Sequence, residues 1–316
     1  MARQQFHAIC FVLAAAALLL GWGGKASAEG FLLGEKTCLE CHGAEHEVWK
    51  GTKHFSSFRE VHRADKAKGI LKAVGAKRMK GNETCTLCHY SMEQKSASAK
   101  ARAKSGPGCE SCHSPASEWL NIHNNYGGPN VKRDTETPEH RAQRLAQSAE
   151  NGMILSSDRY GIAENCMSCH GMNHSGLDGD TLAKMLGAGH PLKTEFELVL
   201  YSQGTVRHRF YPPNVNQNAE MTAQELARLF VEGQAAKLVS ATDALSKSSD
   251  AKYQEAQKKR AADASSALSS VKSVPEAAAL LGDPNEANAR KLVNAVAEKD
   301  LTSEVGGLLP DKSKYK

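Results

Sequence analysis

The hydrophobic positions of this chain are unevenly distributed, and they divide it into a polar N-terminal part and a helical C-terminal part. Residues 34–125 contain few long hydrophobic runs and predict short helices joined by polar loops. Toward the C-terminus, apolar positions such as Leu226, Leu229 and Phe230 recur at helical spacing. The pattern predicts a mainly α protein with little regular sheet and a helical extension at its C-terminal end.

Capping residues mark four helix starts. A Ser, Thr or Asp at the N-cap accepts hydrogen bonds from the first turn, and a proline in that turn or a glutamate three residues on strengthens the signal. The predicted N-caps are Thr137, Thr222, Ser273 and Asp283.

The N-terminus has the pattern of a signal peptide. Arg3 supplies a positive charge, an apolar stretch over 9–20 is too short to span a bilayer comfortably, and Ala26-Ser27-Ala28 offers a cleavage site. We expect cleavage after Ala28 and export to the periplasm. Cys10 would be lost with this leader, and its position before the apolar core disfavours a lipoprotein anchor. No later stretch predicts a membrane span.

Four copies of Cys-x-x-Cys-His, here called motifs 1 to 4 in chain order, are the strongest chemical signal. The two cysteines can lie on one side of a helical turn and form thioethers to a haem, and the histidine then binds the iron. One copy could arise by chance, but four copies predict four covalently bound haem c groups. The predicted attachment residues are Cys38, Cys41, Cys85, Cys88, Cys109, Cys112, Cys166 and Cys169, followed by His42, His89, His113 and His170.

Other uses of these residues fit less well. Disulfides do not explain a histidine directly after every cysteine pair, and structural zinc usually draws its ligands into one cluster. The formal net charge of +5 falls to about +3 without the leader, and the propionates of four haems would outweigh it. The lysines are dispersed and lack interleaved aromatic residues, so we expect no nucleic-acid binding.

Haem would also compensate for the polarity of the chain. Aromatic residues make up only 6% of the sequence, so an ordinary core would be hard to build and the haems should form much of it. The apoprotein should therefore fold poorly. The predicted organisation is a signal peptide at residues 1–28, a tetrahaem cytochrome c domain with a haem-packed core at 29–215 and a cofactor-free helical extension at 216–316. The extension should pack over the haem domain, with docking or contact between copies as the alternative.

The other histidines of the mature chain decide how reactive the irons are. A second histidine makes an iron six-coordinate and suited to electron transfer, whereas an open face lets a small molecule bind. The candidates for the second ligand are His46, His54, His62, His123, His140, His174, His190 and His208.

The chain resembles the tetrahaem cytochrome c-554 family, whose founding members accept electrons from hydroxylamine oxidoreductase in ammonia oxidisers. The resemblance runs from about Glu35 to Tyr211. It is carried by the element Trp49-Lys50-Gly51-Thr52-Lys53-His54 after motif 1 and by the block Gly108-Cys109-Glu110-Ser111-Cys112-His113-Ser114-Pro115.

This resemblance implies distal ligands for three motifs. In that family, the histidine that matches His123 binds the first haem, and the histidine that matches His54 binds the third. The stretch from Glu195 to His208 resembles the family segment that carries the distal ligand of the fourth haem. The implied partners are therefore His123 for motif 1, His54 for motif 3 and His208 for motif 4.

Motif 2 is the open position. Founding members leave this iron five-coordinate, but this chain departs from them at Ala188-Gly189-His190-Pro191. A histidine between glycine and proline has a constrained backbone, which suits a fixed ligand. We expect His190 to bind the iron of motif 2, with motif 4 as its alternative. His174 is the next candidate, although a solvated position suits it better, and exposed positions are expected for His46, His62 and His140.

Three functions are compatible with these features. The first is periplasmic electron transfer between redox proteins through stacked haems with two histidine ligands each, without a catalytic residue. The second is a haem redox enzyme that acts on a small nitrogen or sulfur species at a five-coordinate iron on His89. The third is a subunit of an extracellular haem filament. Redox partners should dock through transient, salt-sensitive contacts, and the sequence does not identify them.

Overall fold

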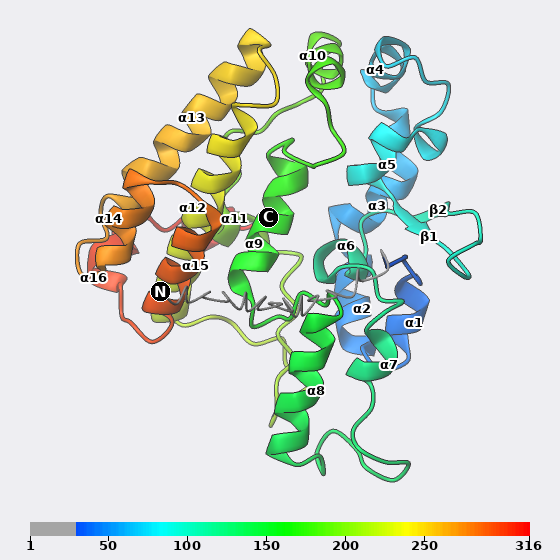
Figure 1. The fold of residues 1–316 in the computed structure, drawn as a ribbon, viewed down its shortest axis with the longest axis vertical. Helices are drawn as coiled ribbons and strands as arrows, with labels where there is room; N and C mark the ends of the chain where they lie inside the picture. The colour runs from blue at the N-terminus through cyan, green and yellow to red at the C-terminus, as the bar shows by residue number, and fades with distance from the viewer. Residues whose placement is uncertain (1–29) are drawn as a thin grey trace, which may run out of the picture.

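The computed structural model describes residues 30–316, so the predicted leader, its cleavage site and Cys10 lie outside the described residues. The protein is mainly α, as predicted, and the only sheet within 30–316 is a two-stranded antiparallel pair. In Figure 1 the N-terminal elements occupy one side, the C-terminal helices occupy the other, and α9 (Arg159–His170) runs between them. No helix in this part of the chain is both long and apolar enough to cross a membrane.

Short elements make up the N-terminal half, as its sparse hydrophobic pattern predicts. They bury few apolar side chains: Ala67, Met79, Cys85 and Tyr90 form a small cluster, and Ala116 and Trp119 are buried apart from it. The elements are α1 (Glu35–Leu39), α2 (Gly43–Lys50), α3 (Lys53–Glu60), η1 (Val61–Arg63), α4 (Ala67–Ala73), η2 (Met79–Gly81), α5 (Glu83–His89), β1 (Ser91–Glu93), β2 (Arg102–Ser105), α6 (Cys109–His113) and α7 (Leu120–His123).

The remaining helices are longer. The middle of the chain forms α8 (Pro138–Glu150), α9, α10 (Gly179–Gly187) and α11 (Leu198–Ser202). The predicted extension forms α12 (Ala223–Ala244), α13 (Ala251–Leu268), α14 (Pro275–Gly282), α15 (Glu286–Val296), α16 (Thr302–Val305), η3 (Gly306–Leu308) and η4 (Lys312–Lys314).

Two of the four predicted N-caps are confirmed. Thr137 caps α8, and Thr222 forms a capping box with Glu225 at the start of α12. The predictions for Ser273 and Asp283 are wrong by one or two residues. Ser273 instead hydrogen-bonds the carboxylate of Glu304 through its amide and hydroxyl groups. Asp283 is the C-cap residue of α14.

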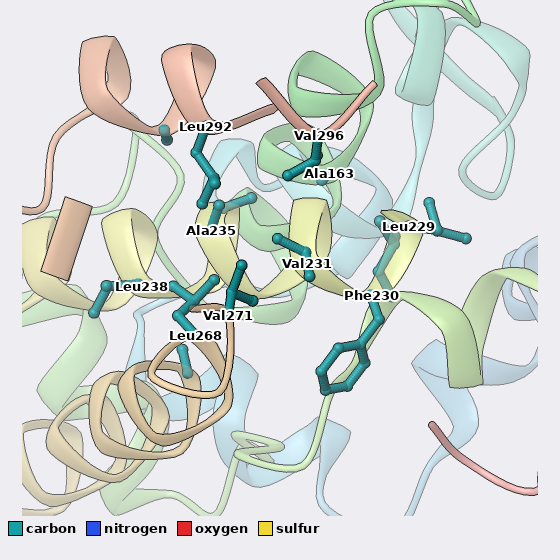
Figure 2. Close-up of a cluster of buried hydrophobic side chains, with 14 of the residues drawn as sticks. Ala163, Leu229, Phe230, Val231, Ala235, Leu238, Leu268, Val271, Leu292 and Val296 are labelled. Atoms are coloured by element: carbon teal, nitrogen blue, oxygen red, sulfur yellow. The ribbon is translucent and has the colours of Figure 1, made fainter. Parts of the chain in front are cut away.

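The main hydrophobic core surrounds α12. Figure 2 shows Val231 and Ala235 of α12 among side chains from neighbouring helices, including Ala163 of α9, Leu268 of α13 and Leu292 of α15. All five side chains are at most 1% exposed. The expectation that the chain would lack an ordinary core is therefore wrong for its C-terminal half. Since α9 carries motif 4, the extension shares this core with a helix that is predicted to attach haem.

Candidate haem-binding sites

The four motifs lie at helix ends. Three helices end at a motif histidine: α5 at His89, α6 at His113 and α9 at His170. Motif 1 begins in α1, and His42 is the N-cap residue of α2. All eight motif cysteines are free of disulfides. In motifs 2 to 4 the two cysteines lie about one helical turn apart, as attachment to a single haem requires.

Each motif histidine faces a second histidine at nearly the same distance. Two imidazoles on opposite sides of one iron would have ring centres about 6 Å apart, because each metal–nitrogen bond is about 2 Å long. The observed ring-centre distances are 6.2 Å for His42 and His123, 6.0 Å for His89 and His190, 6.4 Å for His113 and His208, and 6.0 Å for His170 and His54. The residues therefore fit an iron with two histidine ligands at every motif.

Backbone carbonyls orient three of these rings. The distance from Nδ1 to a carbonyl oxygen is 2.8 Å for His113, 2.9 Å for His190 and 2.6 Å for His208. A proton on Nδ1 that is donated to a carbonyl leaves Nε2 free to bind a metal and fixes the plane of the ring. This arrangement is typical of histidine ligands.

Burial also favours the neutral form of several of these histidines. It lowers the pKa of His89, His123 and His170 to about 4. The pKa of His54 is lowered for the same reason. Neutral imidazole is the form that binds a metal, so these rings are in the binding form at neutral pH.

Two of the distal partners differ from those that the resemblance implies. His123 faces motif 1 as implied, and His190 faces motif 2. However, His54 lies opposite His170 instead of His113, and His208 lies opposite His113 instead of His170.

The path of residues 204–209 accounts for the position of His208. The amide of Thr205 donates to the carbonyl of Lys316, with an N–O distance of 2.9 Å. The guanidinium of Arg209 binds the carboxylate of Glu225 at 2.7 Å. The segment is thus anchored to the C-terminal residue and to the start of α12. These contacts carry His208 past motif 4 to motif 3.

The motifs follow one another in space in the order 1, 3, 4, 2. The Cys38 thiol of motif 1 hydrogen-bonds Cys109 of motif 3, which raises the pKa of Cys38. A similar contact joins Cys88 of motif 2 to Cys169 of motif 4. Between these pairs, Asn165 of α9 donates to a carbonyl of α6 at 2.8 Å. Motifs 1 and 2 therefore lie at the two ends of a row.

An ion pair beside α8 supports His123, which faces motif 1. Arg144 is 7% exposed and donates to the carbonyl oxygen of His123 at 2.6 Å. Both oxygens of Glu136 accept from this guanidinium at 2.6 Å, and His140 Nδ1 lies 2.7 Å from one of them. Arg144 and His140 lower the pKa of Glu136 to about 2.

Acid should therefore weaken the ion pair between Glu136 and Arg144, which supports His123. Because the folded-state pKa of Glu136 lies below its ordinary value of 4.5, its stabilisation is complete above pH 4.5 and is lost as the pH falls toward 2. We expect the wild type to lose more stability over this interval than Glu136→Gln, which lacks the titrating group. Denaturant unfolding at a series of pH values checks this. Equal pH dependence in the two proteins would show that the ion pair does not contribute.

The other four histidines are not paired with a motif histidine among residues 30–316. They are half-buried, so the prediction of exposed positions is wrong. His46 and His62 each have a buried Nδ1 without a partner among residues 30–316, and His140 binds Glu136. His174 Nδ1 accepts a hydrogen bond from the amide of Gly176 at 3.1 Å.

Sequence reasoning missed the role of Glu110, the residue after the first cysteine of motif 3. Its carboxylate is 5% exposed and accepts from the amides of Leu33, Gly34 and Ala116 at 3.0, 2.6 and 2.7 Å. It thus ties the start of the described chain to motif 3. The only signal was its position inside a motif, where a charged residue gives no indication of burial.

Sequence reasoning also missed one face of α13, which holds the chain around the end of motif 4. Three side chains at helical spacing contact residues on either side of His170. The contacts are Tyr253 Oη to Met172 O (2.9 Å), Gln257 Nε2 to Gly171 O (2.9 Å) and Arg260 Nη2 to Met167 Sδ (3.4 Å). Met172 has a φ of 50°, so Tyr253 binds a residue in the left-handed region.

Arg260 is a buried cation without a carboxylate partner in residues 30–316. Its side chain is 0% exposed, and its polar neighbours are neutral: Gln257 accepts from it at 2.5 Å, and Ser240 Oγ lies 3.4 Å away. Burial lowers the pKa of Arg260 to about 10, so the guanidinium stays charged at neutral pH. Motif 4 therefore lies beside an uncompensated positive charge.

Helices that present Cys-x-x-Cys-His motifs, each opposite a second histidine, are typical of a c-type cytochrome, which binds haem c covalently. Residues 37–114 match the family described as cytochrome c554 and c-prime. The chain is also 29% identical to cytochrome c-554 of Nitrosomonas europaea over 173 residues, which is 53% of this chain and 68% of the relative. These matches support the resemblance of the chain to the cytochrome c-554 family, whose members are electron-transfer cytochromes. No solved structure matches the chain.

Proposed function

We propose that the protein is a periplasmic tetrahaem electron carrier in which every iron has two histidine ligands. The observation that carries the proposal is the common spacing of the four histidine pairs, 6.0 to 6.4 Å between ring centres. Haem c bound at such a pair supplies a reversible one-electron couple. The eight histidines would hold four haems in pairs, which would leave no open position on an iron for a substrate.

The surrounding residues keep this ligation rigid. Backbone carbonyls orient three imidazoles, Arg144 holds the carbonyl of His123, and α13 holds the chain beside His170. Fixed ligands that change little between oxidation states favour fast electron exchange. The thiol contacts that link motif 1 to motif 3 and motif 2 to motif 4 support two stacked pairs of haems within one row.

The position of His190 speaks against the enzyme alternative. A redox enzyme would need an open face on the iron of motif 2, and the His190 ring lies 6.0 Å from that of His89. The filament alternative loses its main argument for a similar reason, because each motif has a distal histidine from its own chain. Export to the periplasm is supported by the predicted leader, since haem c is attached outside the cytoplasm.

Electron paramagnetic resonance of the oxidised protein tests the carrier function. Four low-spin signals that integrate to one iron each are expected, because each iron would have two imidazole ligands. Addition of nitric oxide should leave these signals unchanged. A high-spin signal that disappears with nitric oxide would contradict the proposal and favour catalysis at one motif.

A further inference from the structure

Positive charge is concentrated on one short segment of the N-terminal half. Residues 59–80, which run from the end of α3 through η1 and α4 into η2, are here called the basic face. This face contains eight Lys or Arg residues and two acidic residues, a net charge of +6, whereas the rest of residues 30–316 carries about −2. The eight are Arg59, Arg63, Lys66, Lys68, Lys72, Lys77, Arg78 and Lys80.

These charges are available to a partner. Seven of the eight side chains belong to exposed residues, and Lys80 is half-buried. None of the eight forms an ion pair with a carboxylate in the part of the chain that the structure describes. The neighbouring charges of Arg63 and Arg59 add to burial in lowering the pKa of Lys80. Like charges gathered without internal partners repel one another, and an external anionic surface would relieve that repulsion.

The basic face borders both histidines of the motif 2 pair. Lys66 packs closely against Gly189, the residue before His190. A Cβ atom added to Gly189 would lie 3.0 Å from Lys66 Cδ. Lys80 Nζ lies 3.3 Å from the ring centre of Phe58 and 5.7 Å from that of Tyr90, which follows His89. In Figure 1, α4 lies at the end of the N-terminal half that is farthest from α7. The face thus covers the motif 2 end of the row.

We propose that the basic face is the docking surface of an acidic redox protein, so that electrons enter or leave the row at motif 2. This inference rests on the proposed carrier function and names the chemistry of one partner. Complementary charge steers diffusional encounter and raises association rates at low salt. Residues 59–80 contain no aromatic side chain to stack bases, so a protein surface fits better than a nucleic acid.

Charge reversal on α4 tests the proposal in the full-length holoprotein. Lys68 and Lys72 are exposed, and their spacing of four residues places them on one helix face. The probe is a reduced plant-type ferredoxin with an acidic surface, and the readout is the rate of haem reduction by stopped flow. At an ionic strength of about 0.01 M, the double variant K68E/K72E should react about tenfold more slowly than the wild type. The difference should vanish near 1 M, where screening is almost complete.

A matched control changes the same number of charges elsewhere. Lys252 and Lys258 are exposed residues of α13, on the far side of the molecule from α4, and K252E/K258E should react at nearly the wild-type rate. Equal slowing by both double variants would mean that only net charge matters, and no slowing by K68E/K72E would place docking elsewhere; either result overturns the inference. Salt-sensitive binding of duplex DNA or phosphatidylserine vesicles, lost in K68E/K72E, without ferredoxin reactivity would also overturn it. The low-spin haem count of each variant tests the carrier function separately.

Discussion

Replacement of His190 by alanine is expected to convert one of the four haem irons from low spin to high spin and to leave the other three unchanged. The His190 ring lies 6.0 Å from that of His89, and its Nδ1 is 2.9 Å from the carbonyl of Pro191. Alanine removes the imidazole and leaves one axial position open. Electron paramagnetic resonance should then show about a quarter of the haem as high spin, and nitric oxide should bind to that fraction alone.

Two further variants define the role of His190. His174→Ala is the matched control, because this histidine is also half-buried but hydrogen-bonds the amide of Gly176. It should keep four low-spin signals. His190→Met should restore a low-spin iron and raise its midpoint potential, since a thioether favours the reduced state more than imidazole does. Four low-spin signals in His190→Ala would show that another group binds this iron.

Replacement of Arg260 by methionine is expected to lower the midpoint potential of the haem attached through motif 4. A positive charge that is buried without a counter-ion disfavours the extra charge of ferric iron. At the effective dielectric of a protein interior, loss of a unit charge about 10 Å from an iron changes the ratio of reduced to oxidised haem about tenfold, and we expect an effect on that scale. For one electron this is a shift of about 59 mV. A redox titration followed by electron paramagnetic resonance would assign the shift to one signal.

Three other variants separate charge from packing. Arg260→Lys keeps the charge and should keep most of the potential, although it loses the bond to Met167. Ser240→Asp places a carboxylate near Arg260 and should lower the potential without deleting the guanidinium, which also covers the case in which Arg260→Met folds poorly. Lys258→Met removes an exposed charge from the same helix and should have little effect, because water screens it. A fall in potential with Lys258→Met as large as with Arg260→Met would contradict the role of burial.

Much of the fold could be predicted because helical periodicity and capping are local signals. The sparse pattern of residues 34–125 gave short helices, and the capping box at Thr222 marked α12 to the residue. The predicted starts at Ser273 and Asp283 failed because other contacts compete for the capping groups. The hydroxyl of Ser273 donates a hydrogen bond to Glu304, a residue 31 positions away that no local pattern indicates.

In the candidate site, too, local signals could be predicted and long-range contacts could not. Four motif histidines follow from spacing alone, and the distinctive setting of His190 between glycine and proline indicated a ligand. The partners of His54 and His208 could not be deduced, because their places depend on long-range packing. His208 is positioned through Thr205 and the last residue of the chain. His54 lies in the first turn of α3, and its carbonyl approaches Gly106 so closely that no side chain would fit there.

The core around α12 has a consequence for how the protein matures. Its side chains come from α9, from the start of α11 and from the helices after residue 222, and they bury one another. The C-terminal half therefore contains apolar contacts of its own, which would let it fold before haem is attached. Of the four motifs, only motif 4 sits on a helix that belongs to this early nucleus, with Cys166 packed against it. We would then expect the chain to receive haem as a half-folded precursor, with motifs 1 to 3 outside the half that folds first.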